Sequence, residues 1–157
     1  MAADIVSTLS EQLRPAAGTG EMARDAFVLR LEPPELLPTV KRLRDEFGFD
    51  MFLDVTAVDW MGQVPRFEVV HHFYSSQHHI RVRLKTRVGE DAPVVDSLTL
   101  LYGSAAFMER ECHDMYGIRF EGNDDLRPIL LYEGFVGHPL RKDYPKQQEQ
   151  PLVPYRN

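Results

Sequence analysis

Cysteine is nearly missing from this sequence: Cys112 is the one cysteine among 157 residues. A single thiol can close no internal disulfide, and it cannot supply the roughly four thiolates that hold an iron–sulfur cluster. We therefore expect no cluster on this chain. We interpret Cys112 as a small buried thiol on a helix.

Long apolar runs and an excess of positive charge are also missing. No stretch approaches the about 20 apolar residues that a membrane-spanning helix needs, and the first residues lack a basic segment followed by an apolar one. The chain has 24 acidic against 18 basic side chains, a net charge of -6. Because this charge opposes a phosphate backbone, we expect no nucleic-acid partner. Because apolar spans are missing, we expect a cytosolic chain whose membrane contact is made through other proteins.

Sequence motifs for nucleotide binding and hydrolysis are missing as well. We find no glycine-rich phosphate loop, no G-x-G-x-x-G, no G-x-S-x-G and no H-E-x-x-H. These are the patterns that cradle phosphates, expose a nucleophilic serine or hold zinc. The sequence therefore predicts no catalytic site and no site for NADH, FMN or another cofactor.

The residues that are present predict one folded domain with a tail. Hydrophobic residues make up 43% and charged residues 27% of the chain, which is typical of a globular protein. Apolar periodicity and glycine or proline breaks predict helices at 2–14, 33–48 and 104–116 and strands at 26–31, 51–58, 67–74 and 79–87. The apolar strand at 51–58 is expected near the middle of the sheet. Ser104 is expected to cap the last helix, and Gly117 to end it.

Beyond residue 121, glycine and proline recur and leave little room for regular structure. A segment of this length without its own core usually packs on something else. We therefore expect an α+β domain over residues 1–121, with a mostly antiparallel sheet of about four strands flanked by helices. A long irregular C-terminal arm, residues 122–157, is expected to dock on partner subunits.

Two features of the predicted hairpin leave alternatives open. The strand at 79–87 places four cations on one face, which suits either a solvated surface or a docking site for an acidic partner: Arg81, Arg83, Lys85 and Arg87. Two histidine pairs, His71 with His72 and His78 with His79, flank the turn. Adjacent strand residues point to opposite faces, so each pair offers at most one ligand to a metal. A freestanding metal-dependent enzyme that uses these histidines is therefore the weakest alternative.

The segment from 109 to 145 is dense in charge and turn residues. In order, it contains Glu109-Arg110-Glu111, Asp114, Gly117-Ile118, Phe120-Glu121-Gly122, Asp125-Leu126-Arg127, Ile129-Leu130, Gly134-Phe135 and Gly137-His138-Pro139-Leu140-Arg141-Lys142-Asp143-Tyr144-Pro145. This order closely resembles the signature of the 30-kDa subunit of the proton-pumping NADH:quinone oxidoreductase, respiratory complex I. Three positions depart from that pattern: Phe107 replaces a usual tryptophan, Asn123 a histidine or lysine, and Pro128 a second arginine.

The resemblance implies a non-redox structural and assembly subunit in the hydrophilic arm of that enzyme, on the cytoplasmic face of the bacterial inner membrane. It implies partners that resemble the 49-kDa, PSST and TYKY proteins of the same enzyme. The departures keep open an equivalent subunit of a membrane-bound hydrogenase or formate hydrogenlyase. The residues expected at a partner interface are Glu109, Arg110, Glu111, Asp114, Arg127, His138, Arg141, Lys142 and Asp143.

Helical spacing also pairs some of these residues within the chain. Glu109 with His113, and Arg110 with Asp114, stand four residues apart. As surface pairs each would contribute only about 0.2 to 0.5 kcal/mol. We therefore expect these charges to act in an interface, with a solvated helix face as the alternative.

Overall fold

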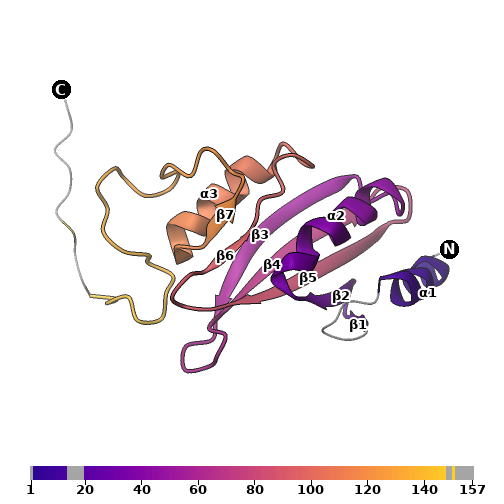
Figure 1. The fold of residues 1–157 in the computed structure, drawn as a ribbon, viewed down its shortest axis with the longest axis horizontal. Helices are drawn as coiled ribbons and strands as arrows, with labels where there is room; N and C mark the ends of the chain where they lie inside the picture. Colours follow the sequence, from indigo (N-terminus) through magenta and orange to yellow (C-terminus); the bar gives the residue numbers. More distant parts are fainter. Residues whose placement is uncertain (1, 14–19, 148–149, 151–157) are drawn as a thin grey trace.

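The computed structural model describes residues 2–13, 20–147 and 150 (Figure 1). The elements are α1 (Ala2–Gln12), β1 (Glu21–Ala23), β2 (Ala26–Leu31), the 3-10 helix η1 (Pro33–Glu35), α2 (Leu36–Asp45), β3 (Met51–Asp59), β4 (Phe67–Ser75), β5 (Ile80–Val88), β6 (Val94–Asp96), α3 (Ala105–Tyr116) and β7 (Arg119–Glu121). The predicted α+β class is confirmed, and each predicted helix and strand has its counterpart within a few residues.

The main sheet has five strands in the order β1-β2-β5-β4-β3. Of its four strand pairs, β2 with β5 is parallel and the other three are antiparallel, so the expectation of a mostly antiparallel sheet is confirmed. The additional strand is β1, which folds back on β2 through a turn in which Arg24 has a positive φ of 58°. A separate parallel pair, β6 with β7, precedes and follows α3 in the chain.

The position predicted for β3 is wrong: it lies at the edge of the sheet and not near its middle. A β-bulge between Phe52 and Asp54 shifts the alternation, so that Phe52 is buried with Val55 while Met51 is 46% exposed. β3 is apolar although it lies at the edge, because α3 packs against it. A covered edge strand needs apolar side chains as a central strand does.

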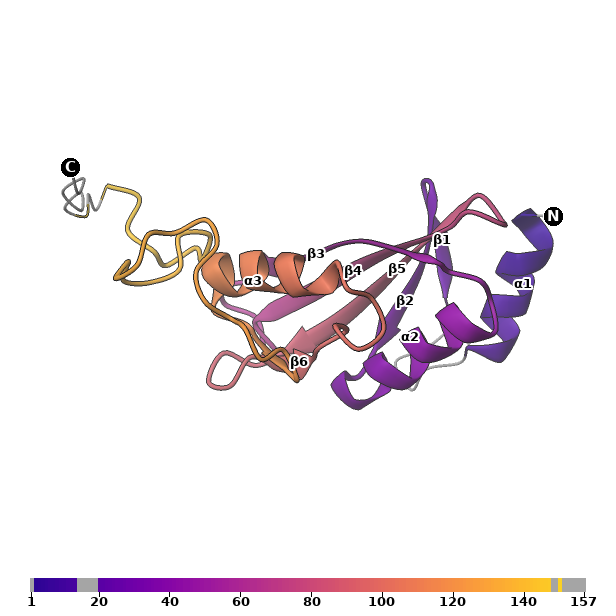
Figure 2. The ribbon, with the colours of Figure 1, turned by 90° about the horizontal axis from the view of Figure 1, so that it is seen from above.

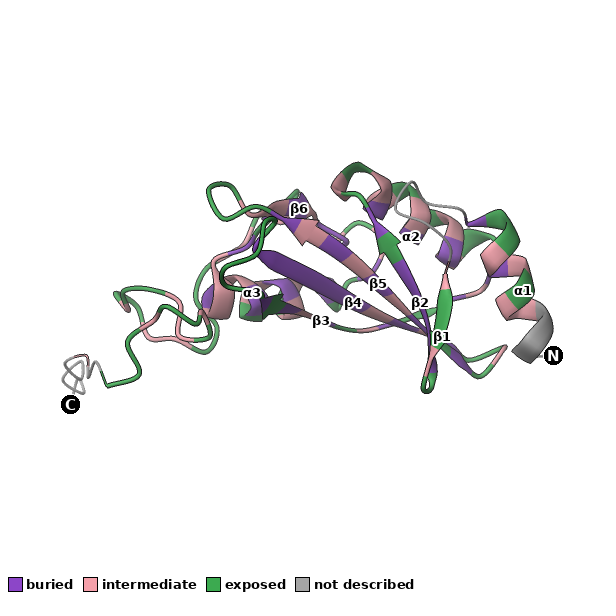
Figure 3. Ribbon diagram, turned by 90° about the horizontal axis from the view of Figure 1, so that it is seen from below, coloured by how far each residue is buried: buried purple, intermediate pink, exposed green. Residues whose placement is uncertain are grey.

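The core lies on the side of the sheet that α1 and α2 cover (Figure 2). Leu36, Val40 and Leu43 form the buried stripe of α2, at the spacing expected for one helix face. They pack in one cluster with the inward residues of the strands, each fully buried side chain contributing about 1.5–3 kcal/mol. Figure 3 shows β4 buried along most of its length, whereas β5 alternates between buried and more exposed residues.

The residues at the two ends of α3 set how the chain enters and leaves this helix. Ser104 precedes the helix, but its hydroxyl makes no capping bond and donates instead to the Phe52 carbonyl at 3.5 Å. Gly117 ends the helix as expected, with a φ of 72° and an amide that donates to the His113 carbonyl at 2.7 Å. The chain then forms β7 and continues into the C-terminal arm.

Candidate functional site

The C-terminal arm leaves β7 at residue 122, passes along α3 and reaches the loop between β3 and β4 (Figure 1). Residues 122–147 and 150 of the arm are described. We call residues 60–66 the hairpin loop. The arm, α3 and the hairpin loop contain all nine residues expected at a partner interface and form the candidate site.

Glu109 lies at the bottom of this site, fully buried. Its carboxylate accepts hydrogen bonds from the Ser97 hydroxyl at 2.8 Å, the Leu98 amide at 2.7 Å and the Asn123 side-chain amide at 2.9 Å. Burial raises the pKa of Glu109, and these three donors oppose the rise. The expected pair with His113 does not form, because the His113 ring donates to the Ile118 carbonyl at 2.9 Å. Glu109 therefore fixes the start of the arm, with Asn123 as one of its donors.

Asp114 and Arg110 hold the next part of the arm and do not pair with each other. One oxygen of the buried Asp114 carboxylate accepts the backbone amides of Ile129, Leu130 and Leu131 at 2.8, 3.0 and 3.3 Å. Three backbone amides thus converge on one carboxylate oxygen, as in an anion-binding nest. Arg110 donates to the carbonyls of Arg127 and Pro128, both at 2.9 Å. The acidic side chain of Asp114 thus binds backbone amides, and the basic side chain of Arg110 binds backbone carbonyls, of one irregular segment, residues 127–131.

The last turn of α3 binds a third part of the arm. The His138 ring donates to the Asp114 carbonyl at 2.9 Å, and the Arg141 guanidinium donates to the Tyr116 carbonyl at 2.6 Å. Burial lowers the pKa of His138. A Cβ on Gly117 would lie 2.4 Å from the His138 ring, so glycine is required here by space as well as by its positive φ. The free carbonyls at the helix end are therefore satisfied by the arm.

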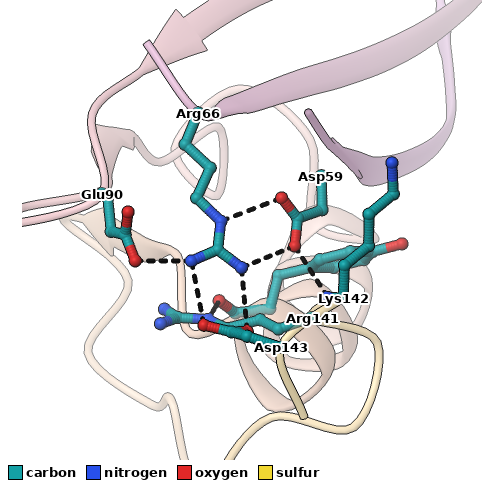
Figure 4. Close-up of polar contacts among 7 residues, drawn as sticks. Asp59, Arg66, Glu90, Arg141, Lys142 and Asp143 are labelled. Atoms are coloured by element: carbon teal, nitrogen blue, oxygen red, sulfur yellow. Dashed lines mark hydrogen bonds and ion pairs between the residues drawn. The ribbon is translucent and has the colours of Figure 1, made fainter. Parts of the chain in front are cut away.

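Residues 141–143 of the arm lie against a buried arginine that sequence reasoning did not find (Figure 4). Arg66 is 5% exposed and forms two bonds to Asp59, at 2.9 and 2.8 Å, and two to Asp143, at 3.0 and 2.8 Å. Glu90 accepts a further bond from Arg66 at 2.5 Å. The guanidinium holds the pKa values of Asp59 and Asp143 below their usual range. The sequence signal was present but weak: opposite charges at the two ends of a hairpin loop.

The other predicted residues of the site lie on its surface. Arg127 is 80% exposed at its side chain and pairs with Asp125 at 2.7 Å. Glu111 and Lys142 are exposed. These positions are the ones that a partner could contact directly, whereas Glu109 and Asp114 are buried beneath the arm.

The four hairpin histidines are not brought together. His71 is fully buried beside Phe52, its ring nitrogens have no hydrogen-bond partner among the described residues, and burial lowers its pKa to about 3. His72 points to the opposite face of β4, and His78 and His79 lie at the turn. Across the residues that the structure describes, no three histidine, cysteine or acidic side chains are grouped as metal ligands.

The cations of β5 are partly neutralised within the chain. Arg81 pairs with Asp25 at 3.0 Å, and Lys85 pairs with Glu68 at 2.6 Å, with Arg87 at 3.8 Å from the same carboxylate. The Arg83 Nε is buried, with no hydrogen-bond partner in the described part of the chain. These pairs favour the interpretation of a solvated sheet face over a strongly basic docking surface.

Comparison with known proteins identifies the family. The model of the "Respiratory-chain NADH dehydrogenase, 30 Kd subunit" family matches residues 29–150. The chain is 41% identical over 139 residues to the C subunit of the NADH-quinone oxidoreductase of Methylobacterium sp. (strain 4-46), covering 87% of this chain and 64% of that relative. It is 43% identical over 124 residues to the C subunit of the same enzyme of Citrifermentans bemidjiense, covering 79% and 77% of the two chains. The chain therefore spans a little under two thirds of the first relative's length.

Two solved structures share the fold. The trypsin-resistant fragment (1-134) of Nqo5 matches with a TM-score of 0.68 at 25% identity, covering 80% of this chain and all of that one. A chain of the membrane-bound sulfane sulfur reductase, an archaeal respiratory membrane complex, matches with a TM-score of 0.80 at 23% identity, covering 92% and 86%. Within the described ranges, no helix has the length and apolar character to cross a membrane. By its family match and its relatives, the chain belongs to the 30-kDa subunit family of the respiratory-chain NADH dehydrogenases.

Proposed function

We propose that this chain is a non-redox structural and assembly subunit of the hydrophilic arm of proton-translocating NADH:quinone oxidoreductase. Electron transfer from NADH to quinone would pass through cofactors held by neighbouring subunits. The chain would have no catalytic site of its own, and it would lie on the cytoplasmic face of the bacterial inner membrane. Its proposed neighbours are the subunits that resemble the 49-kDa, PSST and TYKY proteins.

One observation carries this proposal: the charged residues of the signature bind backbone groups of this chain and hold the arm and α3 together. Asp114 accepts three amides, while Arg110 and Arg141 donate to carbonyls. A general acid or base needs an accessible group that can reach a substrate proton. Asp114, Arg110 and Arg141 are instead occupied by backbone groups and fix the conformation of the arm, as expected of a scaffold subunit.

The division of the chain supports the same function. Both sheets lie between residues 21 and 121, whereas the described part of the arm contributes little to the core, with Leu126 packed at its edge. We propose that the arm is the part that docks on partner subunits. The nine expected interface residues then act in two ways: those bonded to other parts of the chain hold the arm in place, and the exposed Glu111, Arg127 and Lys142 contact the partner.

An equivalent subunit of a membrane-bound hydrogenase or formate hydrogenlyase is the second candidate. The fold recurs in a chain of the membrane-bound sulfane sulfur reductase, which shows that this architecture is used outside NADH dehydrogenases. The two candidates differ in the proteins that copurify with the chain. A freestanding metal enzyme is less well supported, because the histidines it would use lie apart in the part of the chain that is described.

The experiment compares Arg110→Ala with Arg119→Ala in cells that express the tagged chain as their only copy. Arg110 holds the arm, whereas Arg119 is an exposed arginine of β7 that pairs with Glu121. We expect the wild-type chain to copurify with the neighbours named above, and Arg110→Ala to lower the yield of complex while activity per assembled complex stays normal. Arg119→Ala should match wild type. Full yield with lost NADH:quinone activity would place Arg110 in the reaction path and refute the scaffold function.

A further inference from the structure

Arg66 is surrounded by more negative charge than one guanidinium requires. Asp59, whose side chain is 2% exposed, already binds it through two hydrogen bonds and neutralises it within the hairpin. Asp143 and Glu90 are added from the arm and from the loop after β5, and their side chains are 46% and 56% exposed. Because a buried pair is complete without them, their contacts serve to attach other segments to Arg66.

The arm contacts both members of this pair. The Asp143 carboxylate accepts two bonds from Arg66, and the preceding Lys142 amide donates to Asp59 at 2.8 Å. Arg141 stacks over the ring of Phe67 at 5.0 Å, and Arg66 lies 4.9 Å from the same ring. The turn at 141–143 therefore fits into a socket formed by Asp59, Arg66 and Phe67.

The socket is also the base of the hairpin loop. The Trp60 amide donates to the Arg66 carbonyl at 2.9 Å, and the Gln63 amide donates to the Trp60 carbonyl at 2.8 Å. Arg87 of β5 donates to the Pro65 carbonyl and, at 3.3 Å, to the Gln63 side chain. The loop is thus fixed at its base and along one side, while its tip exposes apolar side chains.

Exposed apolar side chains gather on the two segments that meet at Arg66. Of the twelve large hydrophobic residues exposed among those described, seven belong to the hairpin loop and the arm: Trp60, Met61, Val64, Ile129, Leu130, Val136 and Leu140. Both segments lie at the end of the molecule away from α1 (Figures 1 and 2). We call these seven residues the loop–arm surface. The two segments that carry them are joined at Arg66, and contiguous exposed apolar surface is typical of a protein or membrane contact.

We propose that Arg66 locks the hairpin loop and the arm into one preformed docking surface, and that an apolar patch of a partner protein subunit covers it. This rests on the proposed function, since it requires a partner subunit. The charges of these segments favour a protein over anionic lipid. Residues 122–147 of the arm carry four acids and four bases, and the loop after β5 adds Glu90 and Asp91, whereas the hairpin loop has Arg66 paired with acids and Arg87 of β5 beside it. Surfaces that bind anionic lipid carry a basic excess.

The lock is tested by hydrogen exchange on the isolated chain with Asp143→Asn. Loss of a charged acceptor should speed exchange of the Lys142 and Tyr144 amides about tenfold. Amides of 129–131 and of β4 should stay unchanged, which separates local release from unfolding. Asp91→Asn is the matched control, since it removes the exposed carboxylate next to Glu90 in the chain, and Asp143→Glu should restore part of the protection. Wild-type exchange in Asp143→Asn would overturn the lock.

The surface is tested by copurification with Met61→Asp and Leu140→Asp, compared with Met22→Asp. All three side chains are about half exposed, at 55%, 52% and 52%, but Met22 lies on β1, outside the loop–arm surface. We expect the first two variants to lose at least tenfold in recovered partner and the third to match wild type. Equal recovery of all three, with wild type still bound to partners, would refute the surface but leave the proposed function standing. Failure of the wild-type chain to copurify with any partner would refute the proposed function. Binding of the chain to phosphatidylglycerol vesicles in place of a partner would show that the loop–arm surface binds lipid and not a protein.

Discussion

His71 should make the stability of this protein depend on pH in a way that one substitution removes. The side chain is fully buried on the core side of β4, opposite Val55 and Leu84, and neither ring nitrogen has a hydrogen-bond partner among the described residues. Burial lowers its pKa from 6.5 to about 3, with a smaller contribution from His72. The folded state therefore keeps a neutral ring over a range in which the unfolded chain takes up a proton.

The sign and size follow from proton linkage. Below pH 6.5 the unfolded state binds one more proton than the folded state, so the free energy of unfolding falls as the pH falls and levels off near the folded pKa. Each pH unit costs about 1.4 kcal/mol, which gives a loss of about 2 kcal/mol at about pH 5 and about 3 kcal/mol at about pH 4. For a domain of marginal stability, about 2 kcal/mol is a large part of the total.

The assay is urea unfolding of wild type and His71→Leu between about pH 7 and about pH 4. Leucine is of similar size and leaves no unsatisfied nitrogen in the core, so the variant should be at least nearly as stable at neutral pH. As the pH falls, the unfolding free energy of wild type should drop below that of the variant by a further amount of about 2 kcal/mol at about pH 5 and about 3 kcal/mol at about pH 4. The other titrating groups contribute equally to both proteins and drop out of the difference. His79→Asn, at the exposed turn with a positive φ of 54° that asparagine tolerates, should follow wild type. A difference that stays constant with pH would show that the His71 ring is protonated or hydrated in the folded state.

Three further outcomes are expected. Asp114→Asn should weaken the nest that holds residues 129–131, speeding exchange of those amides and lowering stability by about 1–3 kcal/mol, whereas Glu111→Gln on the exposed side of α3 should do neither. Cys112 is buried and burial raises its pKa, so thiol reagents should label it at the rate of unfolding and not faster; rapid labelling of native protein would contradict its place in the core. Purified chain should contain no stoichiometric iron, zinc or flavin by elemental analysis and absorbance, since one cysteine and separated histidines offer no complete ligand set, and a metal bound one to one would contradict this.

The regular elements could be predicted because their patterns are local. The strand at Ala26–Leu31 and the helix stripe of Leu36, Val40 and Leu43 follow directly from apolar spacing. The strands β1, β6 and β7 were missed because three residues carry no period. The edge position of β3 could not be predicted, since an apolar run is the same whether a neighbouring strand or α3 covers it.

The contacts made by the expected interface residues could not be predicted from the sequence. Charge density and resemblance pointed to Glu109, Arg110 and Asp114, yet spacing suggested pairs along the helix. The actual partners of Arg110 and Asp114 are backbone groups of residues 127–131, which have no distinctive side-chain pattern. Arg66 was missed because its partner Asp143 lies 77 residues away in sequence, and only the completed fold brings them together.

The contacts of the arm give a physical reason to expect few tolerated substitutions between residues 109 and 145. An irregular segment that buries few apolar side chains gains little from the hydrophobic effect, so its order depends on polar contacts. A buried carboxylate that accepts three amides, or a glycine with no space for a Cβ, can be replaced only at a high cost, because each alternative leaves buried groups unpaired or forces a clash. Apolar core positions elsewhere accept one another more readily. We therefore expect the charged residues of this segment to tolerate substitution least, because their contacts determine the shape of the chain.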